Sequence, residues 1–311
     1  MSAPQISIAF YNVENLFDTV DGAHTLDHDY TPKGKKKWGP YRFNIKIQKL
    51  GNAISKIGND MPPVLVGLAE VENKTVLNAL INSEKLKEHA YQYIHFDSPD
   101  ERGIDVALLF NTRYFQPITS EVIPIEVYNS KNIRDYTRDI LYVKGELMGE
   151  LIHIYVNHWP SKRTGHDETQ RKRIHIAKLI HDHMDALKEH SPKIVVLGDF
   201  NDNPTDESIQ NHLAINGLKN PMVDLYTNGL GSLKFYGKWM LFDQILLSSP
   251  FFEPKPNKLV FKEANIFNAD FLTNPRGRYK NTPFRTYSGK YYLGGCSDHF
   301  PVYVLLESKK A

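Results

Sequence analysis

The stretch that decides the fold is residues 193–204, which read KIVVLGDFNDNP. Its apolar run is continuous rather than alternating, which is typical of a β-strand covered on both faces. Asp199 and Asn201 follow this run two residues apart, so an extended backbone directs both side chains to the same side. Taken alone, the stretch is equally compatible with an ordinary strand-to-loop exit, because short motifs carry a high false-positive risk.

Composition places the chain among ordinary globular proteins. Of its 311 residues, 41% are hydrophobic and 24% are charged, which are typical values. A net charge of +2 is too balanced to indicate a polyanion-binding protein, so a nucleic-acid role has to come from local patches. Cys296 is the only cysteine, which excludes an internal disulfide and favours a cytoplasmic location. No apolar run is long enough to span a bilayer, and we expect a single domain over residues 1–311 that functions as a monomer.

Strands and helices are distributed along the chain in a pattern typical of α/β proteins. Besides the opening stretch, apolar β-formers predict strands at residues 6–13, 64–71, 91–96, 105–110, 122–127, 139–147, 151–157, 242–247 and 301–306. Helical spacing predicts helices at residues 42–57, 75–86, 167–187 and 206–215. About ten strands, a few helices and no break in composition favour one α/β domain with stacked sheets. The aperiodic segments 18–41 and 249–295 are predicted to be loops that line the cleft, although solvated charge alone also explains residues 18–41.

One polar pattern recurs at the ends of the predicted strands. The residues are Asn12, Glu70, Asp105, Asn157 with His158, Asp199 with Asn201, Asp243, and Asp298 with His299. If these ends converge, several carboxylates, amides and two imidazoles share one site. That inventory suits a hard divalent ion such as Mg²⁺ or Mn²⁺, which prefers oxygen ligands. The single cysteine argues against a structural zinc site.

The chemistry that matches this inventory is phosphoryl transfer to water. Such a site must neutralise the phosphate oxygens, hold a water in line and stabilise the leaving oxygen. A carboxylate beside an imidazole orients and charges it, which makes the histidine a base or a phosphate-binding cation near neutral pH. Amides supply donors to phosphate without adding charge.

Seven short motifs, taken together, resemble the endonuclease/exonuclease/phosphatase superfamily, the group that includes pancreatic-type deoxyribonuclease and the exonuclease-III-type repair nucleases. They are YNV at 11–13, AEV at 69–71, RGIDVALL at 102–109, NHWPS at 157–161, GDFN at 198–201, FDQI at 242–245 and SDHFPV at 297–302. The motifs run from end to end in the family's order. Each one alone is weak, but their combination is specific.

The resemblance implies an α/β fold, the deoxyribonuclease-I-like four-layer sandwich in which two central mixed β-sheets are flanked by helices. It also implies a Mg²⁺ (or Mn²⁺) site with Glu70 as the chief ligand and Asn12 and Asp298 nearby. His299, paired with Asp243, would act as base or bind the scissile phosphate.

Four further residues complete the implied site. Asp199 would orient the water or protonate the leaving group, and Asn201 would donate to a phosphate oxygen. His158 would contact the phosphate from the other side, with Asn12 and Arg102 as further phosphate-binding residues. From neighbouring strand ends, rather than from the resemblance, we expect His158 to pair with Asp105.

The leading functional hypothesis is a divalent-metal-dependent phosphodiesterase, specifically a nuclease that hydrolyses DNA or RNA by in-line attack of water. The alternative is a phosphatase or phosphodiesterase acting on a small-molecule, inositol or lipid phosphate ester, and a third reading is a non-catalytic binding protein. Residues 238–244 lack the Trp-Cys-Asp-Arg type signature of the inositol-phosphatase branch, and residues 68–73 lack the Gln-Glu-Thr-Lys of the exonuclease-III branch. Neither specialised branch fits, so the substrate stays open.

Several conspicuous residues have two readings. Lys162-Arg163 and Arg171-Lys172-Arg173 either cradle a substrate backbone or form a solvated helix face. Trp159 adjoins His158 and is either a core residue or a base-stacking platform. Glu72 is expected to be a solvated acid before a helix, and Cys296 a small packing residue.

Overall fold

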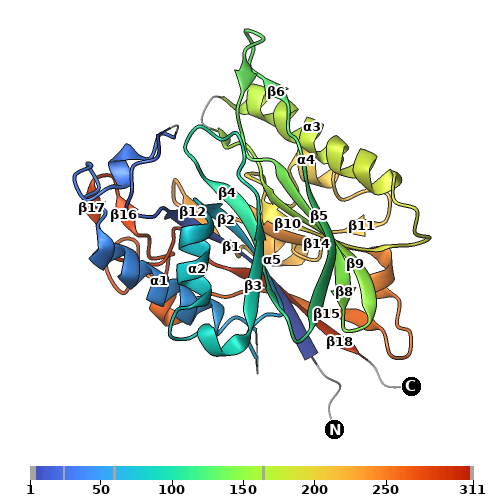
Figure 1. The fold of residues 1–311 in the computed structure, drawn as a ribbon. Helices are drawn as coiled ribbons and strands as arrows, with labels where there is room; N and C mark the ends of the chain where they lie inside the picture. Colours follow the sequence, from blue (N-terminus) through green and yellow to red (C-terminus); the bar gives the residue numbers. More distant parts are fainter. Residues whose placement is uncertain (1–4, 24, 59–60, 163–164, 309–311) are drawn as a thin grey trace.

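The computed structural model describes residues 5–23, 25–58, 61–162 and 165–308, and its centre is a pair of six-stranded β-sheets (Figure 1). The first sheet has the order β15 (Leu259–Ile266), β18 (Val302–Ser308), β1 (Gln5–Leu16), β2 (Leu65–Val71), β4 (Asp105–Asn111), β3 (Tyr91–His95). The second has the order β11 (Leu218–Lys219), β14 (Asp243–Ser248), β10 (Lys193–Asp199), β9 (Glu150–His158), β8 (Ile140–Leu147), β5 (Phe115–Ile123). Both sheets are mixed, because β1 pairs with β2 and β9 with β10 in parallel, whereas the other pairs are antiparallel.

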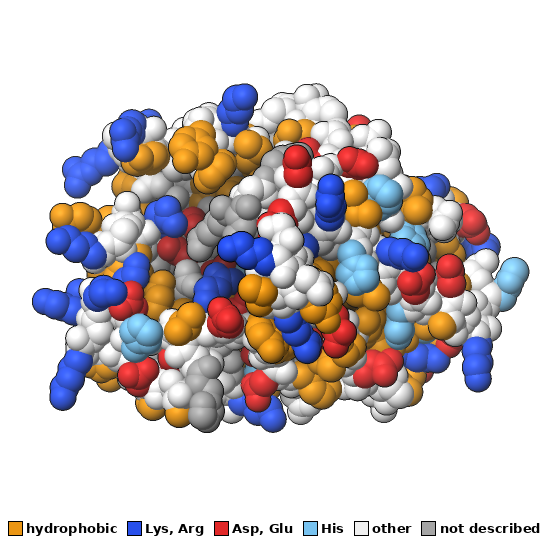
Figure 2. Space-filling model, turned by 90° about the horizontal axis from the view of Figure 1, so that it is seen from above, with side chains coloured by type: hydrophobic (Ala, Val, Ile, Leu, Met, Phe, Trp, Pro, Cys, Tyr) orange, Lys and Arg blue, Asp and Glu red, His pale blue; other side chains and the backbone are white. Residues whose placement is uncertain are grey.

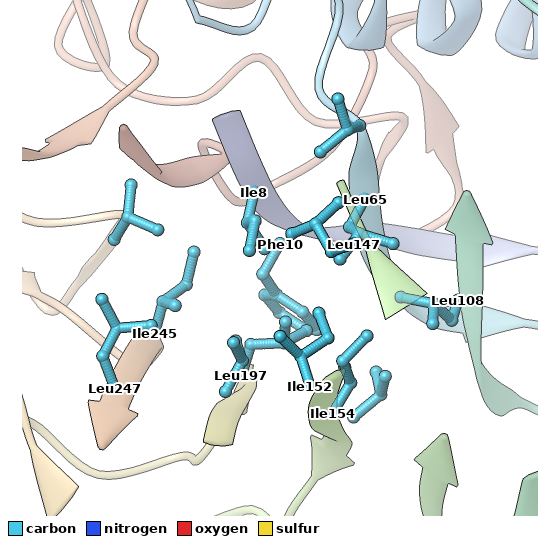
Figure 3. Packing of buried hydrophobic residues seen from close by; sticks show 14 of the residues in the cluster. Ile8, Phe10, Leu65, Leu108, Leu147, Ile152, Ile154, Leu197, Ile245 and Leu247 are labelled. Atoms are coloured by element: carbon cyan, nitrogen blue, oxygen red, sulfur yellow. The ribbon is translucent and has the colours of Figure 1, made fainter. Parts of the chain in front are cut away.

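The two sheets pack face to face through one apolar core. Ile8 and Leu65 from the first sheet meet Leu197 and Ile245 from the second, and all four side chains are excluded from solvent (Figure 3). A Cβ atom at Gly67 would lie 2.0 Å from Leu197 Cδ1, so only glycine lets β2 approach β10 this closely.

Helices cover the two outer faces and complete four layers. Apolar residues of α1 (Pro40–Ile54) and α2 (Lys74–Ile81) pack on β1 and β2. Those of α3 (His166–Asp185) and α4 (Glu207–Gln210) pack on β9 and β10. Within the described residues, the other helical elements include α5 (Val223–Thr227), η1 (His28–Tyr30), η2 (Lys87–His89), η4 (Ser249–Phe252) and η5 (Asp270–Leu272). The four-layer sandwich predicted from the sequence is therefore confirmed.

Four predicted elements differ from the structure, and one of them is the helix predicted at 75–86, which ends at Ile81. The segment 249–295, predicted to be a loop, contains the eight-residue strand β15, which two prolines precede and a bulge between Phe261 and Glu263 interrupts. The strand predicted at 122–127 is wrong in its position. The strand β5 ends at Ile123, and β6 (Val127–Tyr128) belongs to a small hairpin with β7 (Arg134–Asp135). The helix predicted at 206–215 stops after one turn at Gln210.

Two further hairpins stand at the rim near the C-terminal ends of β1 and β2. They are β12 (Leu233–Phe235) with β13 (Lys238–Met240), and β16 (Tyr287–Ser288) with β17 (Tyr291–Tyr292) (Figure 1). None of the described helices combines the length and the apolar character that crossing a bilayer requires.

Candidate active site

Three neighbouring strands of the second sheet end in a row of ionisable side chains. The parallel register of β9 and β10 sets His158 beside Asp199, and the antiparallel register of β10 and β14 sets Asp199 beside Asp243. A Cβ atom at Gly198 would lie 2.5 Å from the Asn157 carbonyl oxygen, so the glycine before Asp199 keeps β10 and β9 closely packed beneath this row. The regular sheet therefore holds the row rigidly.

His299 and Asp243 form a buried ion pair. His299 Nδ1 lies 2.6 Å from Asp243 Oδ2, and the same carboxylate accepts a hydrogen bond from the Ser232 hydroxyl at 2.5 Å. Burial by itself would lower the pKa of His299, but Asp243, and secondarily Asp199 and Asp298, raise that pKa well above its ordinary value. The Asp243 carboxylate therefore favours the protonated imidazolium form of His299.

Asp199 lies between the two histidines. Its Oδ2 is 3.7 Å from His158 Nε2 and 4.0 Å from His299 Nδ1, and it accepts a 3.0 Å hydrogen bond from Asn12 Nδ2. Burial, reinforced by the charge of Asp243, raises the pKa of Asp199 to about 6, whereas His299 and Asn12 oppose the shift. Asn12 thus reaches across from the first sheet to orient Asp199.

Asn201 completes this side of the site. Its backbone adopts φ +51°, a left-handed conformation that asparagine tolerates, and its amide N–H donates to Asp199 Oδ1. The side-chain Nδ2 donates to the Trp159 carbonyl at 2.8 Å, which leaves one amide hydrogen available.

The first sheet contributes Glu70 and its neighbours through an irregular strand end. The pairing of β1 with β2 shifts register between Asn12 and Leu16, and Glu14, Asn15 and Glu70 all adopt positive φ. The Asn15 backbone N–H donates to Glu70 Oε2 at 2.8 Å. Such bulges redirect side chains at strand ends, and here the redirected groups include two carboxylates.

Glu14 is a site residue that sequence reasoning missed. It is buried, its carboxylate accepts from the Thr286 N–H at 2.6 Å, and its carbonyl accepts from the buried Lys46 ammonium, which also donates to Thr286 Oγ1 at 2.8 Å. Burial and the nearby Asp298 raise the pKa of Glu14 to about 7, although Lys46 and Arg285 oppose the shift. The sequence does hold one signal for a buried acid here, because Lys46 is a charged residue within the apolar stripe of its helix. The stripe includes Phe43, Ile47 and Leu50.

These residues face one hollow of about 370 Å³. It is lined by Asn12, Glu70, Arg102, His158, Asp199, Asn201, Asp298 and His299, together with Glu14, Asn15, Tyr30, Lys36, Arg138, Ser161, Arg285, Tyr287 and Gly289. Eight of the nine predicted site residues thus line a common hollow, and the ninth, Asp243, lies directly behind His299. The hollow lies at the end of the molecule that Figure 2 faces, opposite the two chain termini.

The two long segments predicted to line the cleft both do so. Tyr30 and Lys36 come from residues 18–41, and Arg285, Tyr287 and Gly289 come from residues 249–295. The Lys36 ammonium lies 4.9 Å from the centre of the Tyr287 ring and donates to the Gly289 carbonyl at 2.6 Å. The two segments therefore support each other across the rim.

Arg138, a second residue that sequence reasoning missed, supports the opposite wall. Its guanidinium donates to Asp100 at 2.9 Å and to the Trp159 carbonyl at 3.0 Å. Burial lowers the pKa of Arg138, and the charge of Asp100 is the largest influence that opposes the shift. Arg102 also contacts Asp100, with Nε 3.4 Å from Oδ1.

The family model described as "Endonuclease/Exonuclease/phosphatase family" matches residues 7–308. The chain belongs to this family. No curated protein matched the sequence. Among solved structures, D. rerio TDP2 complexed with single strand DNA product has 14% identity and a TM-score of 0.60, over 98% of this chain and 99% of that one. The human Nocturnin catalytic domain with bound sulfate anion has 16% identity and a TM-score of 0.60, over 99% and 96%. A family protein from Bacteroides thetaiotaomicron has 17% identity and a TM-score of 0.57, over 98% of both chains.

Members of the endonuclease/exonuclease/phosphatase family are metal-dependent hydrolases of phosphoric ester bonds, and a divalent metal fits the acids of this hollow. Glu70, Glu14 and Asp298 all face it, and the proximity of Asp298 raises the pKa of Glu14. A cation among these carboxylates would relieve their repulsion. Asp199, Asp243 and His299 also bring ligand atoms within 4.8 Å of one another. The 2.6 Å hydrogen bond between His299 and Asp243 occupies that space, however, so the Glu70 side is the better candidate.

Two sequence expectations about pairs and solvation are wrong. Asp105 pairs with His95, whose Nε2 lies 3.1 Å from Oδ2, rather than with His158. Glu72 is half-buried and accepts the Asp18 N–H at 2.5 Å, and burial raises its pKa to about 8, so it is not a solvated acid.

Trp159 is fully buried against Phe200 and is a core residue. Cys296 is a buried thiol, and burial raises its pKa to about 11.

Arg173 anchors the loop that follows β10 instead of forming a solvated face or a substrate cradle. Its Nε lies 2.6 Å from Asp202 Oδ2, its Nη1 donates to the Pro160 carbonyl at 3.2 Å, and both charged side chains are buried. Lys162 also contacts Asp202, at 2.7 Å, and Lys172 is held by Asp135 and Glu168. Arg163, the other basic residue of that prediction, lies outside the described residues.

We expect Arg173→Met to destabilise the protein by about 3 kcal/mol, because it leaves the Asp202 carboxylate buried without its main partner. Urea unfolding followed by circular dichroism measures this change. The matched control is Arg171→Met on the exposed face of the same helix, which should change the free energy of unfolding by less than about 0.5 kcal/mol. Equal stability of the two variants would show that the buried pair has no such role.

Proposed function

We propose that the chain is a Mg²⁺-dependent phosphodiesterase that acts as a nuclease. One observation carries the proposal: His299, which is paired with Asp243 behind it, and Asp199 face the same hollow as the Glu70 carboxylate. A phosphodiester placed between them would have Glu70, a ligand for a metal, on one side. On its other side it would have the His299 cation and the Asp199 carboxylate. This arrangement suits in-line attack of water on phosphorus.

The residues of the chain take distinct roles in this proposal. The His299 imidazolium, held by Asp243, stabilises negative charge that develops on the phosphate oxygens. Asp199, with a pKa of about 6, sits close enough to neutrality to orient the water or to pass a proton to the leaving oxygen. Asn201 has an amide hydrogen left for a phosphate oxygen, and His158 flanks Asp199 on the far side.

Glu70 would hold the cation, with Asp298 and the side-chain oxygen of Asn12 nearby. A bound Mg²⁺ or Mn²⁺ supplies Lewis-acid stabilisation of the phosphate charge. We favour Mg²⁺ because the available ligands are oxygens. Asp298 also forms a 2.7 Å ion pair with Arg285, which keeps the carboxylate oriented along the hollow.

A nucleic-acid substrate is supported by one structural neighbour and by the local surface. The D. rerio TDP2 structure was solved with single strand DNA product, and four cationic side chains line the catalytic hollow of this chain: Lys36, Arg102, Arg138 and Arg285. The second candidate is a small phosphate ester, which the 370 Å³ hollow is large enough to contain. We further propose that the enzyme is a monomer and, because its one cysteine is a free thiol, that it acts in the reducing cytoplasm.

A substrate panel separates these candidates. We expect hydrolysis of bis-p-nitrophenyl phosphate and of DNA or RNA with Mg²⁺, loss of both activities in EDTA and recovery when Mg²⁺ is restored. Inositol phosphates and p-nitrophenyl phosphate should be poor substrates. Hydrolysis of inositol phosphates alone would favour the second candidate, and no Mg²⁺- or Mn²⁺-dependent hydrolysis of any phosphodiester would contradict the proposed function.

A further inference from the structure

A second, larger hollow continues from the catalytic one. Its volume is about 550 Å³, and it shares Arg285 and Asp298 with the catalytic hollow. Its walls come from the β12–β13 hairpin and from residues 274–293, which contribute Lys234, Tyr236, Asn274, Arg278, Tyr279 and Leu293. We call this hollow the flanking subsite. Apart from Asp298 and its ion-pair partner Arg285, none of its side chains is used in the proposed chemistry.

The described lining of the flanking subsite combines cations with exposed aromatic rings. Lys234, Arg278 and Arg285 carry three positive charges, against one acid, Asp298. Tyr236 is 91% exposed and Tyr279 is 55% exposed, so both rings are accessible to a ligand. On the left of Figure 2, the side that carries β12, β16 and β17 in Figure 1, Lys and Arg side chains stand among hydrophobic ones.

Each of the two tyrosines contacts the residue that precedes it in sequence. Phe235 packs edge-on against Tyr236 with ring centres 4.4 Å apart, and the Arg278 guanidinium lies 4.6 Å from the centre of the Tyr279 ring. Exposed aromatic rings beside cations are the combination that binds single-stranded nucleic acid, because bases stack on the rings and phosphates contact the cations. Stacking of this kind requires unpaired bases.

The β12–β13 hairpin is tied to the catalytic pair. Ser232, just before β12, donates its hydroxyl to Asp243, and its carbonyl accepts the Phe300 N–H at 2.7 Å. Trp239 of β13 stacks on Phe300 with ring centres 6.1 Å apart. A nucleotide bound on this hairpin would therefore have a fixed position relative to His299.

The opposite side of the catalytic hollow has different chemistry. A smaller hollow of about 240 Å³ adjoins it through Arg102, Arg138 and Ser161. There Asp100 binds both arginines, and Glu101 and Asp135 add further negative charge. Among the described residues, the flanking subsite is therefore the more positive of the two sides, and it is the side that attracts a polyanion.

From this asymmetry we propose that the flanking subsite binds unpaired nucleotides on one side of the scissile phosphate, with bases stacked on Tyr236 and Tyr279 and phosphates on Lys234 and Arg278. The inference rests on the proposed nuclease function, which it narrows to single-stranded nucleic acid or single-stranded ends. Binding in the flanking subsite makes the enzyme selective for a nucleic-acid polymer over a small phosphodiester.

Fluorescence anisotropy tests the subsite without turnover. The probe is a labelled, phosphorothioate-linked single-stranded oligodeoxynucleotide of about 12 nucleotides, a length within the usual range of single-strand binding sites, titrated with the full chain in Mg²⁺. We expect the double substitution Tyr236→Ala/Tyr279→Ala to raise Kd at least about tenfold. Lys234→Ala/Arg278→Ala should weaken binding and reduce its salt dependence. Tyr41→Ala, at a 78% exposed tyrosine outside both hollows, is the matched control and should bind like wild type.

Hydrolysis of bis-p-nitrophenyl phosphate reports on the fold and on the proposed function separately. All three variants should hydrolyse this small diester at the wild-type rate. If wild-type and variant Kd values for the oligonucleotide are equal, or if a duplex of the same length binds as tightly as the single strand, the subsite is wrong while the phosphodiesterase proposal stands. If bis-p-nitrophenyl phosphate and all nucleic acids resist hydrolysis by wild type, the proposed function itself fails.

Discussion

Glu70→Gln will reduce Mg²⁺-dependent hydrolysis of bis-p-nitrophenyl phosphate by about 10³-fold or more, because it removes the charge that holds the cation whose stabilisation of the phosphate the reaction needs. The glutamine keeps the shape of the side chain and an oxygen that can accept the Asn15 N–H, so the protein should remain folded. Initial rates give the activity, and isothermal titration with Mg²⁺ should show weaker binding.

Glu72→Gln is the control for this substitution. Glu72 lies two residues further along the chain and outside the hollow, and its pKa of about 8 keeps it largely uncharged at neutral pH. Its replacement by an amide should therefore leave the rate close to wild type. Wild-type activity in Glu70→Gln, or equal losses in both variants, would contradict the assignment of Glu70.

His299→Asn should lower the rate by about 10³-fold, within the range typical of acid–base and charge-stabilising residues. Asp243→Asn should cost less on its own, because the imidazole remains in place but loses the carboxylate that charges and orients it. Since the two residues act as a unit, the double variant should be no slower than His299→Asn alone. A steady-state double-mutant cycle at saturating Mg²⁺ measures this coupling.

The matched control is His95→Asn, which breaks the equivalent buried pair with Asp105 outside the hollow. We expect it to leave the rate per folded molecule unchanged. Additive losses for His299 and Asp243, or a loss in His95→Asn as large as in His299→Asn, would show that the catalytic pair has been misassigned.

The site was predictable where a regular strand carries its residues. His158, Asp199 and Asp243 directly follow or begin apolar β runs, so a common sheet edge brings them together by register alone. The stretch at residues 193–204 therefore contributes side chains to the hollow as well as a strand to the sheet. Asp199 occupies the middle of the row, and Asn201 beside it uses its side chain to bind the Trp159 carbonyl.

The pairing of individual side chains was not predictable from strand ends. His158 and Asp105 end strands in different sheets, and the side chain that reaches Asp105 is His95, from the neighbouring antiparallel strand of its own sheet. Partnering depends on sheet order, which the apolar pattern does not specify.

Irregular backbone and long-range contacts hid the remaining residues. Glu14 reaches the hollow because positive φ angles at Glu14 and Asn15 redirect the end of β1. Arg138 is recruited by Asp100, which is 38 residues away in sequence. The strand β15 escaped detection because Lys262 and Glu263 interrupt its apolar run at the edge of the sheet. Edge strands are exposed on one side and lose the continuous apolar signal of buried ones.

The central claim is that a divalent cation binds at Glu70, facing the His299–Asp243 pair across a shared hollow. Anomalous X-ray diffraction from a crystal soaked in Mn²⁺ tests it most directly, because Mn²⁺ takes the same oxygen ligands as Mg²⁺ and gives a measurable anomalous signal. The account predicts a single strong peak in the hollow within bonding distance of a Glu70 carboxylate oxygen. A peak bound by Asp199, Asp243 and His299 instead, or no peak in the hollow, would contradict it.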